Sequence, residues 1–303
     1  METVLITGGT GMIGSALSEA LMDKGYEVIV LTRNTKTAPH KNFGYAEWNI
    51  HQQTIDENAV KKADYIIHLA GANVGEKRWT AKRKKEIIDS RVKSGQLLAK
   101  ALKEITNNVQ AVVSASAIGW YGENKSEAPF VETDPAANDF LGSTCRKWEA
   151  AIQDVSQLGK RLVILRTGIV LSNQAGAYAE LKKTLKFGVA AILGKGQQVI
   201  SWIHIDDVVN MYIAAIENQS MHGVYNAVAP HPVSNKEFIV QIARQRKQFF
   251  VPVHVPAVAL KTLLGEMSEE VLKSANVSSA KIESTGFRFR YSAIEHAVEQ
   301  LED

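Results

Sequence analysis

The feature that most limits the possible folds of this chain is a glycine-rich turn near its N-terminus, Gly8-Gly9-Thr10-Gly11-Met12-Ile13-Gly14. An apolar, β-branched run at residues 3–7 precedes the turn and predicts a buried parallel strand. Residues 15–24 then carry apolar side chains at helical spacing, and residues 27–31 form a second apolar run. This order of strand, turn, helix and strand predicts a dinucleotide-binding βαβ unit.

Each glycine of this turn is required for a different physical reason. Gly8 permits a tight turn, and Gly14 lets the following helix pack closely against the strand. A Cβ atom at Gly11 would block the approach of a pyrophosphate to backbone N–H groups at the positive end of the helix dipole. We therefore expect the turn to bind the cofactor through Gly8, Thr10, Gly11, Met12, Ile13 and Gly14.

The end of the second strand indicates which dinucleotide is bound. An acidic residue about 20 positions after the glycines would bind the ribose 2′-OH and select NAD. Here the strand ends in Leu31-Thr32-Arg33, and no acid stands there. An arginine at this point can pair with a 2′-phosphate, so Thr32 and Arg33 favour NADP, although Arg33 could instead be a solvated surface residue.

The rest of the chain continues the alternation of strands and helices. Strands are expected at residues 63–71, 109–114, 162–166, 202–205 and 224–227, with Trp48 on a possible short strand within a polar, irregular segment at 34–62. Helices are expected at 79–103, 143–158, 177–187, 207–218 and 235–248, with two more after residue 258. Residues 188–196 are expected to be turn-rich, and 251–256 extended. The turn Leu69-Ala70-Gly71 would lie over the cofactor at the carboxyl edge of the sheet.

These patterns predict an α/β protein with a Rossmann-type, doubly wound parallel sheet and a smaller C-terminal α+β domain. The Rossmann domain is predicted to comprise residues 1–170 plus about 202–228. The smaller domain would take about 171–201 plus 229–303, so the chain leaves the first domain and rejoins it.

The composition excludes several classes of protein. The net charge of +3 is too small and too scattered to predict nucleic-acid binding. Cys145 is the only cysteine, so no internal disulfide can form, and no apolar run approaches the length of a membrane-spanning helix. We expect the N-terminal segment to be a core strand and not a signal peptide. We expect a cytoplasmic protein, a monomer or homodimer, with a small-molecule substrate, no nucleic-acid or membrane partner and no metal.

Several stretches together resemble the extended short-chain dehydrogenases/reductases. They are the glycine turn, His68-Leu69-Ala70-Gly71, Ser114-Ala115-Ser116-Ala117 and Trp202-Ile203-His204-Ile205-Asp206-Asp207. The stretches Lys77-Arg78-Trp79, Asp89-Ser90-Arg91, Arg146-Lys147-Trp148-Glu149-Ala150-Ala151 and the tail from Leu264 to Phe287 resemble the atypical "epimerase family" branch with its C-terminal domain of unknown function. The resemblance covers nearly the whole chain and implies an NADP-binding Rossmann domain with a small substrate domain.

The chain departs from the wider family at the catalytic pair. That family uses a tyrosine as acid/base and a lysine four residues later, on the helix after the fifth strand. Aligning Trp148 with the end of that helix places Leu141 and Cys145 at these positions. Neither side chain can replace the pair, and the atypical branch also lacks it.

The resemblance implies other candidates for catalysis and binding. Ser116 matches the family's catalytic serine, and Tyr121 could act as the acid; Cys145 is a weaker candidate. In the branch the Ser-Arg pair lies near the cofactor phosphates, which implicates Arg91, while Glu86 could face the ribose and Val170 the nicotinamide. His204 is expected to be mainly structural, and Asp207 to cap the helix that follows it.

Two hypotheses about function remain open at this point. The first is an NADP-dependent oxidoreductase or epimerase acting on a small polar or nucleotide-linked substrate. The second is a catalytically silent NADP sensor that acts through a partner. The absent Tyr-Lys pair favours the second, whereas the cofactor turn and Ser116 favour the first.

Overall fold

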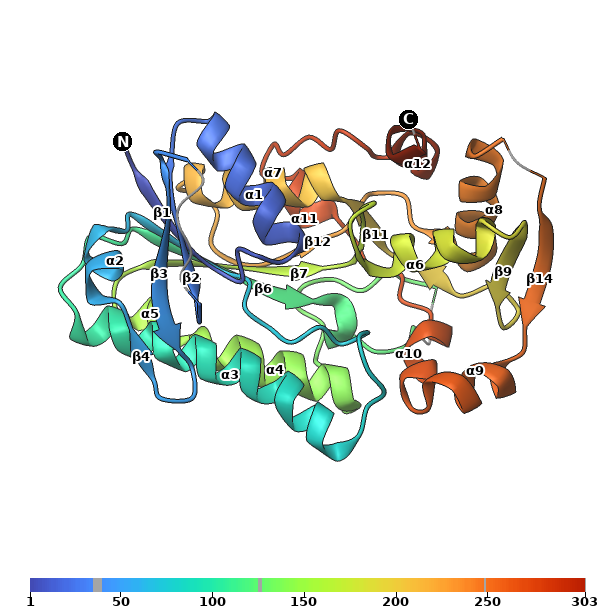
Figure 1. The fold of residues 1–303 in the computed structure, drawn as a ribbon, viewed down its shortest axis with the longest axis horizontal. Helices are drawn as coiled ribbons and strands as arrows, with labels where there is room; N and C mark the ends of the chain where they lie inside the picture. Colours follow the sequence, from blue (N-terminus) through green and yellow to red (C-terminus); the bar gives the residue numbers. More distant parts are fainter. Residues whose placement is uncertain (35–39, 125–126, 248, 303) are drawn as a thin grey trace.

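The computed structural model describes residues 1–34, 40–124, 127–247 and 249–302. Within these residues, eight strands form one large sheet in the order β12-β7-β6-β5-β1-β2-β3-β4 (Figure 1). Neighbouring strands are parallel except for β3 and β4. The strands are β1 (Thr3–Thr7), β2 (Glu27–Thr32), β3 (Phe43–Asn49), β4 (Thr54–Ile55), β5 (Tyr65–His68), β6 (Ala111–Ala117), β7 (Arg161–Thr167) and β12 (Gly223–Ala227). This strand order confirms the predicted Rossmann-type sheet.

Helices cover both faces of this sheet (Figure 1). One face packs on α1 (Met12–Asp23), α7 (Ile205–Glu217) and α11 (Ala280–Glu283). The opposite face packs on α2 (Glu57–Lys62), α3 (Ala81–Glu104), α4 (Phe140–Ile152) and α5 (Asp154–Gln157). The alternation of side chains along each strand explains the two layers, because Val4 and Ile6 enter the first core while Leu5 enters the second.

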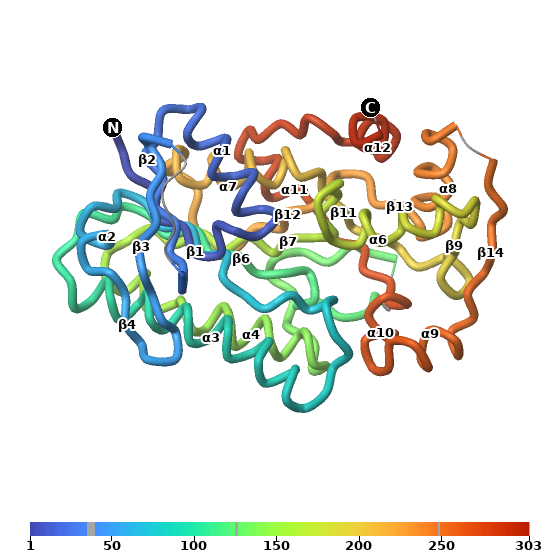
Figure 2. Tube along the Cα trace, viewed as in Figure 1, coloured from blue at the N-terminus to red at the C-terminus, as the bar shows by residue number. Residues whose placement is uncertain are grey.

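The C-terminal part of the chain forms a smaller layer beyond the end of the main sheet (Figure 2). Its strands pair two by two: β8 (Ile169–Leu171) with β11 (Trp202–His204), β9 (Val189–Leu193) with β14 (Val251–Val255), and β10 (Val199–Ile200) with β13 (Val233–Ser234). Its helices are α6 (Gly176–Leu185), α8 (Asn235–Gln245), α9 (Ala257–Leu264), α10 (Met267–Leu272) and α12 (Ile294–Glu302). Tyr178, Trp202 and Phe238 are fully buried in the core between them.

The structure differs from the sequence prediction in several elements. Residues 188–196 contain strand β9, which pairs with β14 some 60 positions away, so no local pattern marks it. The helix expected at 143–158 begins at Phe140, because the Asp139 carboxylate caps it by accepting from Gly142 N, and it ends at Ile152 before the short α5. The division into two domains stays a prediction, with the boundary at residue 170 falling inside β8.

One predicted helix cap is wrong. His204, not Asp207, caps α7, since its ring accepts from Asp206 N. The buried Asp207 carboxylate instead accepts from Arg290 N at 2.7 Å and Tyr291 N at 2.9 Å. This acid therefore fastens the segment before α12 to α7, which packs on the main sheet.

Candidate cofactor and active site

The glycine turn leaves its backbone open at the N-terminus of α1. Gly8 has φ +71°, and Gly11 N donates to Gly8 O at 3.0 Å to close the turn. A Cβ atom at Gly14 would lie 2.6 Å from Gly9 Cα, so only glycine allows this contact between helix and turn. A Cβ atom at Gly11 would meet only Gly8 O, at 3.3 Å, and otherwise open space. The turn is thus packed on one side and accessible at Gly11.

The first residues of α1 suit an anion. Thr10 and Gly11 are exposed, while Met12 and Ile13 are half-buried. No side chain caps this helix, and its first turn contains no acidic residue. Its first backbone N–H groups therefore remain available to a negatively charged group at the positive end of the helix dipole.

A second turn lies directly beside the first. Thr7 Oγ1 accepts hydrogen bonds from Leu69 N and Ala70 N, both at 3.1 Å, so the ends of β1 and β5 are held together. A Cβ atom at Gly8 would clash with the backbone of Leu69 at 2.8 Å. The predicted cofactor turns at Gly8 and Gly71 therefore form one continuous surface at the carboxyl edge.

Arg91 lies under the second of these turns. Its Nη1 donates to the carbonyl oxygens of Ala72 and Ile87, both at 3.0 Å, and its guanidinium stacks 4.8 Å from the centre of the Trp148 ring. Within the described residues no carboxylate pairs with it. Burial and then the positive charge of Arg83 lower the pKa of Arg91 to about 10. A half-buried cation without a counter-ion, next to Gly71, is suited to an anionic ligand.

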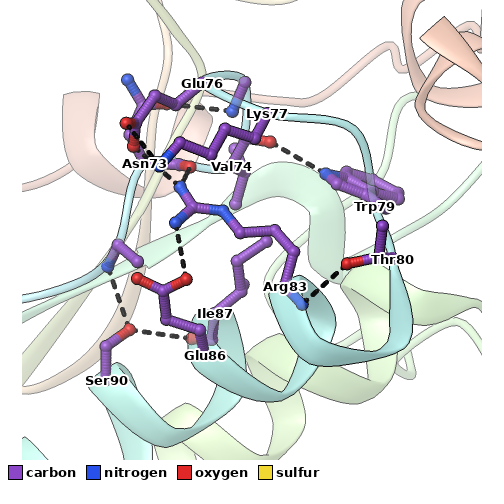
Figure 3. A network of polar contacts seen from close by, with 12 residues as sticks. Asn73, Val74, Glu76, Lys77, Trp79, Thr80, Arg83, Glu86, Ile87 and Ser90 are labelled. Atoms are coloured by element: carbon purple, nitrogen blue, oxygen red, sulfur yellow. Dashed lines mark hydrogen bonds and ion pairs between the residues drawn. The ribbon is translucent and has the colours of Figure 1, made fainter.

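The Glu86 carboxylate forms an ion pair with Arg83 (Figure 3). The buried Arg83 donates to Glu86 Oε2 at 2.8 Å, to Glu76 Oε2 at 2.9 Å and to the carbonyl oxygen of Asn73. Trp79 Nε1 donates to Val74 O at 2.8 Å in the same loop. Glu86 therefore helps to fix the loop at 72–80 beside the cofactor turn, and its proposed contact with a ribose stays a prediction.

Thr32 and Arg33 stand where the adenosine ribose of a Rossmann cofactor is expected. Thr32 ends β2, next to β1 in the sheet, and its hydroxyl accepts from Asn34 N at 3.3 Å. The Arg33 side chain is exposed and forms no ion pair within the described residues. Residues 35–39, which follow it, lie outside the described part of the chain.

Ser116 belongs to a buried ionic network that the sequence did not predict. Its hydroxyl donates to Glu149 Oε1 at 2.6 Å, and the same carboxylate receives two hydrogen bonds from Arg166, at 2.8 Å and 2.9 Å. Ser116 is 3% exposed, Glu149 8% and Arg166 2%. Ser116, Arg166 and Asn226 occupy one row across β6, β7 and β12. The signal in the sequence was the charge of Arg166 directly after the apolar run at residues 162–165.

Tyr121 is at the other end of this network. Its hydroxyl donates to Asn226 Oδ1 at 2.6 Å and accepts from Arg166 Nη1 at 3.0 Å. Burial raises its pKa to about 12, against the opposing charge of Arg166. The ring is 4% exposed and stacks on Phe130. Because the Tyr121 hydroxyl already donates its proton to a buried protein group, the hypothesis that Tyr121 is the acid is weakened.

Leu141 and Cys145 pack against the strand end that carries Ser116. A Cβ atom at Gly119 would lie 3.1 Å from Leu141 Cβ, so the leucine fills the space beside that loop. The Cys145 thiol is 3.7 Å from Ala117 O, and burial raises its pKa to about 12. A neutral buried thiol at this pKa is a packing group rather than a nucleophile.

Val170 is half-buried on β8 and pairs in register with Ile203. Its carbonyl oxygen and the Met12 side chain both lie near Gly176, 3.7 Å and 3.9 Å from where a Cβ atom would stand. The start of α6 therefore approaches the N-terminal end of α1. This arrangement places Val170 O and the Met12 side chain on either side of the start of α6, while the contact of Val170 with a nicotinamide stays a prediction.

His68 ends β5, directly before the turn at Leu69-Ala70-Gly71, and its ring contacts two buried serines. Its Nδ1 lies 3.0 Å from Ser114 Oγ and its Nε2 2.7 Å from Ser94 Oγ. Complete burial and the nearby Arg91 charge lower the pKa of His68 to about 3. The ring is therefore neutral and fastens β5 to β6 and α3.

This depressed pKa predicts how stability depends on pH. The unfolded His68 binds a proton near pH 6.5, whereas the folded one does not until about pH 3. His68 therefore stabilises the fold above about pH 6.5, and this contribution is lost as pH falls toward 3. Between these values one such group makes the free energy of unfolding rise with pH by up to about 1.4 kcal/mol per pH unit. We expect this slope, measured by urea unfolding, to be smaller in His68→Gln than in the wild type. Equal slopes would contradict this assignment.

A cavity of about 430 Å³ opens elsewhere, between β4, α2 and the C-terminal half of α3. Its lining includes Gln53, Lys61, Leu97 and Glu104. It includes no described residue of the glycine turn or the Ser116 network, so we do not assign it to the cofactor.

The described residues also contain no cluster of three or more His, Cys, Asp or Glu side chains that could hold a metal ion, and no helix among them is long and apolar enough to cross a membrane.

Comparison with family models agrees with this geometry. Residues 4–227 match the model of the NAD dependent epimerase/dehydratase family. Residues 255–301 match a domain of unknown function, DUF1731. Among curated proteins, an epimerase family protein of Staphylococcus saprophyticus is 36% identical over 99% of both chains. One from Mycobacterium leprae is 33% identical over 97% of this chain and 94% of its own.

Solved structures show the same arrangement. The human epimerase family protein SDR39U1 (isoform 2), crystallised with NADPH, has a TM-score of 0.87 with 27% identity, covering 99% of both chains. A UDP-glucuronic acid 4-epimerase of Bacillus cereus with bound NAD has a TM-score of 0.80 at 20% identity, covering 98% of this chain and 96% of its own. At that identity the second likeness shows the fold alone.

Proposed function

Since this chain belongs to the NAD dependent epimerase/dehydratase family, we propose that it is an NADP-dependent oxidoreductase or epimerase. The substrate would be a small polar or nucleotide-linked alcohol or carbonyl compound. The observation that carries this proposal is the turn at Gly8–Gly14, which is closed by its own hydrogen bond but open at Gly11. The bound cofactor would accept or supply the hydride.

The residues around the turn fit a dinucleotide. The uncapped N-terminus of α1 would bind the pyrophosphate, and Arg91 beside Gly71 offers a second positive group. Arg33 would pair with a 2′-phosphate. The NADPH in the human relative supports this choice of cofactor, since that structure aligns over nearly the whole chain.

We predict that the wild-type protein binds NADP(H) more tightly than NAD(H), on the order of tenfold, because an arginine–phosphate pair contributes about 1.5–3 kcal/mol. Arg33→Ala should lose most of this difference while NAD affinity stays nearly unchanged. The exposed Arg146, on α4, provides the matched control in Arg146→Ala. Calorimetric titration with both cofactors measures the effect, and equal affinities in the wild type would overturn the prediction.

Ser116 is the best placed group to orient a substrate oxygen. Because its proton is donated to Glu149, the oxygen of Ser116 remains free to accept from a substrate hydroxyl. Tyr121 holds its proton against Asn226 at a pKa of about 12, so we now assign proton transfer to a bound water rather than to Tyr121. Without a dedicated base, alcohol oxidation should be slow at neutral pH and faster as pH rises.

Hydride exchange tests the proposed function. The protein is incubated with carbonyl compounds and NADPH deuterated at the transferred position, and separately with NADP and alcohols or nucleotide sugars deuterated at the carbon that would lose the hydride. We expect the label to move between the cofactor and at least one class of compound, with Ser116→Ala reducing this transfer by about 10²–10⁴-fold and Cys145→Ser changing it little. A wild-type protein that binds NADPH but transfers no label to any compound would contradict the enzyme proposal and favour a sensor.

A further inference from the structure

An apolar surface lies at the end of the molecule opposite the main sheet. Phe187 is 84% exposed and Phe249 87%, and Val258 and Leu263 on α9 are 77% and 70% exposed. The two phenylalanines precede β9 and β14, whose starts are joined by a hydrogen bond from Val251 N to Gly188 O at 2.8 Å. Figures 1 and 2 show both strands side by side at one end of the long axis. Exposed aromatic side chains of this kind require an explanation.

The pair of strands extends this surface. In the register of β9 and β14, Val251 lies beside Val189, Val253 beside Ala191, and Val255 beside Leu193. Side chains at alternate positions of a strand share a face, so these six aliphatic residues form one apolar face. Val251 and Val253 are 48% and 42% exposed, and the other four are half-buried. We call this face, together with Phe187 and Phe249, the terminal apolar surface.

The two segments that contain the strands of the terminal apolar surface carry positive charge only. Residues 181–198 contain four Lys and residues 244–265 contain four Lys or Arg, and neither segment has an Asp or Glu. Lys182 and Arg246 pair with Glu302, and Lys183 pairs with Glu180. The exposed cations without an ion pair within the described residues include Lys186, Lys195, Lys247 and Lys261. The whole-chain net charge of +3 conceals this local excess.

The geometry points to an anionic lipid bilayer as the occupant of this surface. We propose that Phe187 and Phe249 enter the interfacial region of the membrane while the four lysines bind phosphate-bearing headgroups. Aromatic and basic side chains together are the combination that such interfaces favour. The sequence expectation of no membrane partner rested on the absence of a spanning segment, which does not exclude binding at the surface.

Other occupants fit less well. A second copy would bring two positively charged surfaces together, which is unfavourable. An added peptide strand would need donors along the free edge of β14, but Val251 N points to β9, so alternation places Pro252 at the outward position, where it has no N–H. The two phenylalanines also protrude, whereas side chains lining a groove lose most of their exposure.

Vesicle co-flotation of the full-length protein tests this proposal. We expect binding to mixed phosphatidylcholine–phosphatidylglycerol vesicles, little binding to pure phosphatidylcholine, and weakening as salt increases. Phe187→Ser/Phe249→Ser should reduce the affinity by about tenfold or more. Lys186→Glu/Lys247→Glu should reduce it by a similar factor or more, since each lysine near such a surface contributes about fivefold.

Matched variants exclude nonspecific effects. Val131 is 40% exposed and Lys103 is exposed on the last turn of α3, so Val131→Ser and Lys103→Glu alter the same chemistry elsewhere. These controls should bind vesicles as the wild type does, and all variants should keep the wild-type melting temperature. No binding to anionic vesicles, or equal binding by the phenylalanine variant, would overturn the proposal. The proposal would also be overturned if the protein did not bind vesicles and the phenylalanine variant instead abolished a dimer in solution or a complex with an acidic protein.

Discussion

Gly11→Val is expected to abolish dinucleotide binding while the protein remains folded. Gly11 has φ −82° and ψ 173°, a conformation open to valine, and it is exposed. Its Cβ atom would contact only Gly8 O at 3.3 Å, so the fold loses little. The added side chain would occupy the space that a pyrophosphate needs at the N-terminus of α1. We expect affinity for NADP(H) to fall by about a hundredfold or more, measured by calorimetry, with unchanged urea unfolding.

Gly14→Ala is the matched control, because it changes a glycine of the same turn with the opposite consequence. Its Cβ atom would clash with Gly9 Cα at 2.6 Å and with the Gly8 carbonyl oxygen, both backbone atoms that cannot move freely. We expect a loss of unfolding free energy of about 1–3 kcal/mol. If Gly11→Val kept its affinity for both dinucleotides, the phosphate would have to bind elsewhere.

The fold could be predicted because its main signals are local. The glycine turn, its flanking strands and the amphipathic helix at 81–104 each have a characteristic pattern within a short window. Parallel strands that are buried on both faces appear as continuous apolar runs, as at Val28-Ile29-Val30-Leu31. These features were sufficient to predict the Rossmann-type sheet.

The features that were missed depend on contacts between distant segments. Strand β9 exists because residues 251–255 lie beside it, and Asp207 contacts the backbone at 290–291 instead of capping its own helix. In the same way Glu149 and Arg166 are 17 positions apart and belong to different elements. A charge within an apolar run signals a buried partner, but the sequence does not identify that partner.

The buried pair of Glu149 and Arg166 leads to the second large effect. Arg166 donates Nε and Nη2 to the two carboxylate oxygens, and its guanidinium lies 3.7 Å from the centre of the Trp120 ring. Glu149→Ala would leave this cation 2% exposed and without its counter-ion. We expect a loss of about 3–5 kcal/mol of unfolding free energy, because an uncompensated buried charge is costly. Urea unfolding followed by fluorescence measures this loss.

A double variant separates the charge from the packing. In Glu149→Met/Arg166→Met no buried charge remains unpaired, so part of the stability should return, as when buried ion pairs elsewhere are replaced by apolar residues. The exposed pair of Glu57 and Lys61, 3.1 Å apart on α2, provides the surface comparison, and Glu57→Ala should cost less than about 1 kcal/mol. If Glu149→Ala cost no more than this surface variant, Arg166 would have to find water or another acceptor, and Ser116 would not depend on Glu149 for its orientation. If the predicted loss is observed, Glu149 stabilises the carboxyl edge of the sheet, where it also accepts the hydrogen bond from the Ser116 hydroxyl.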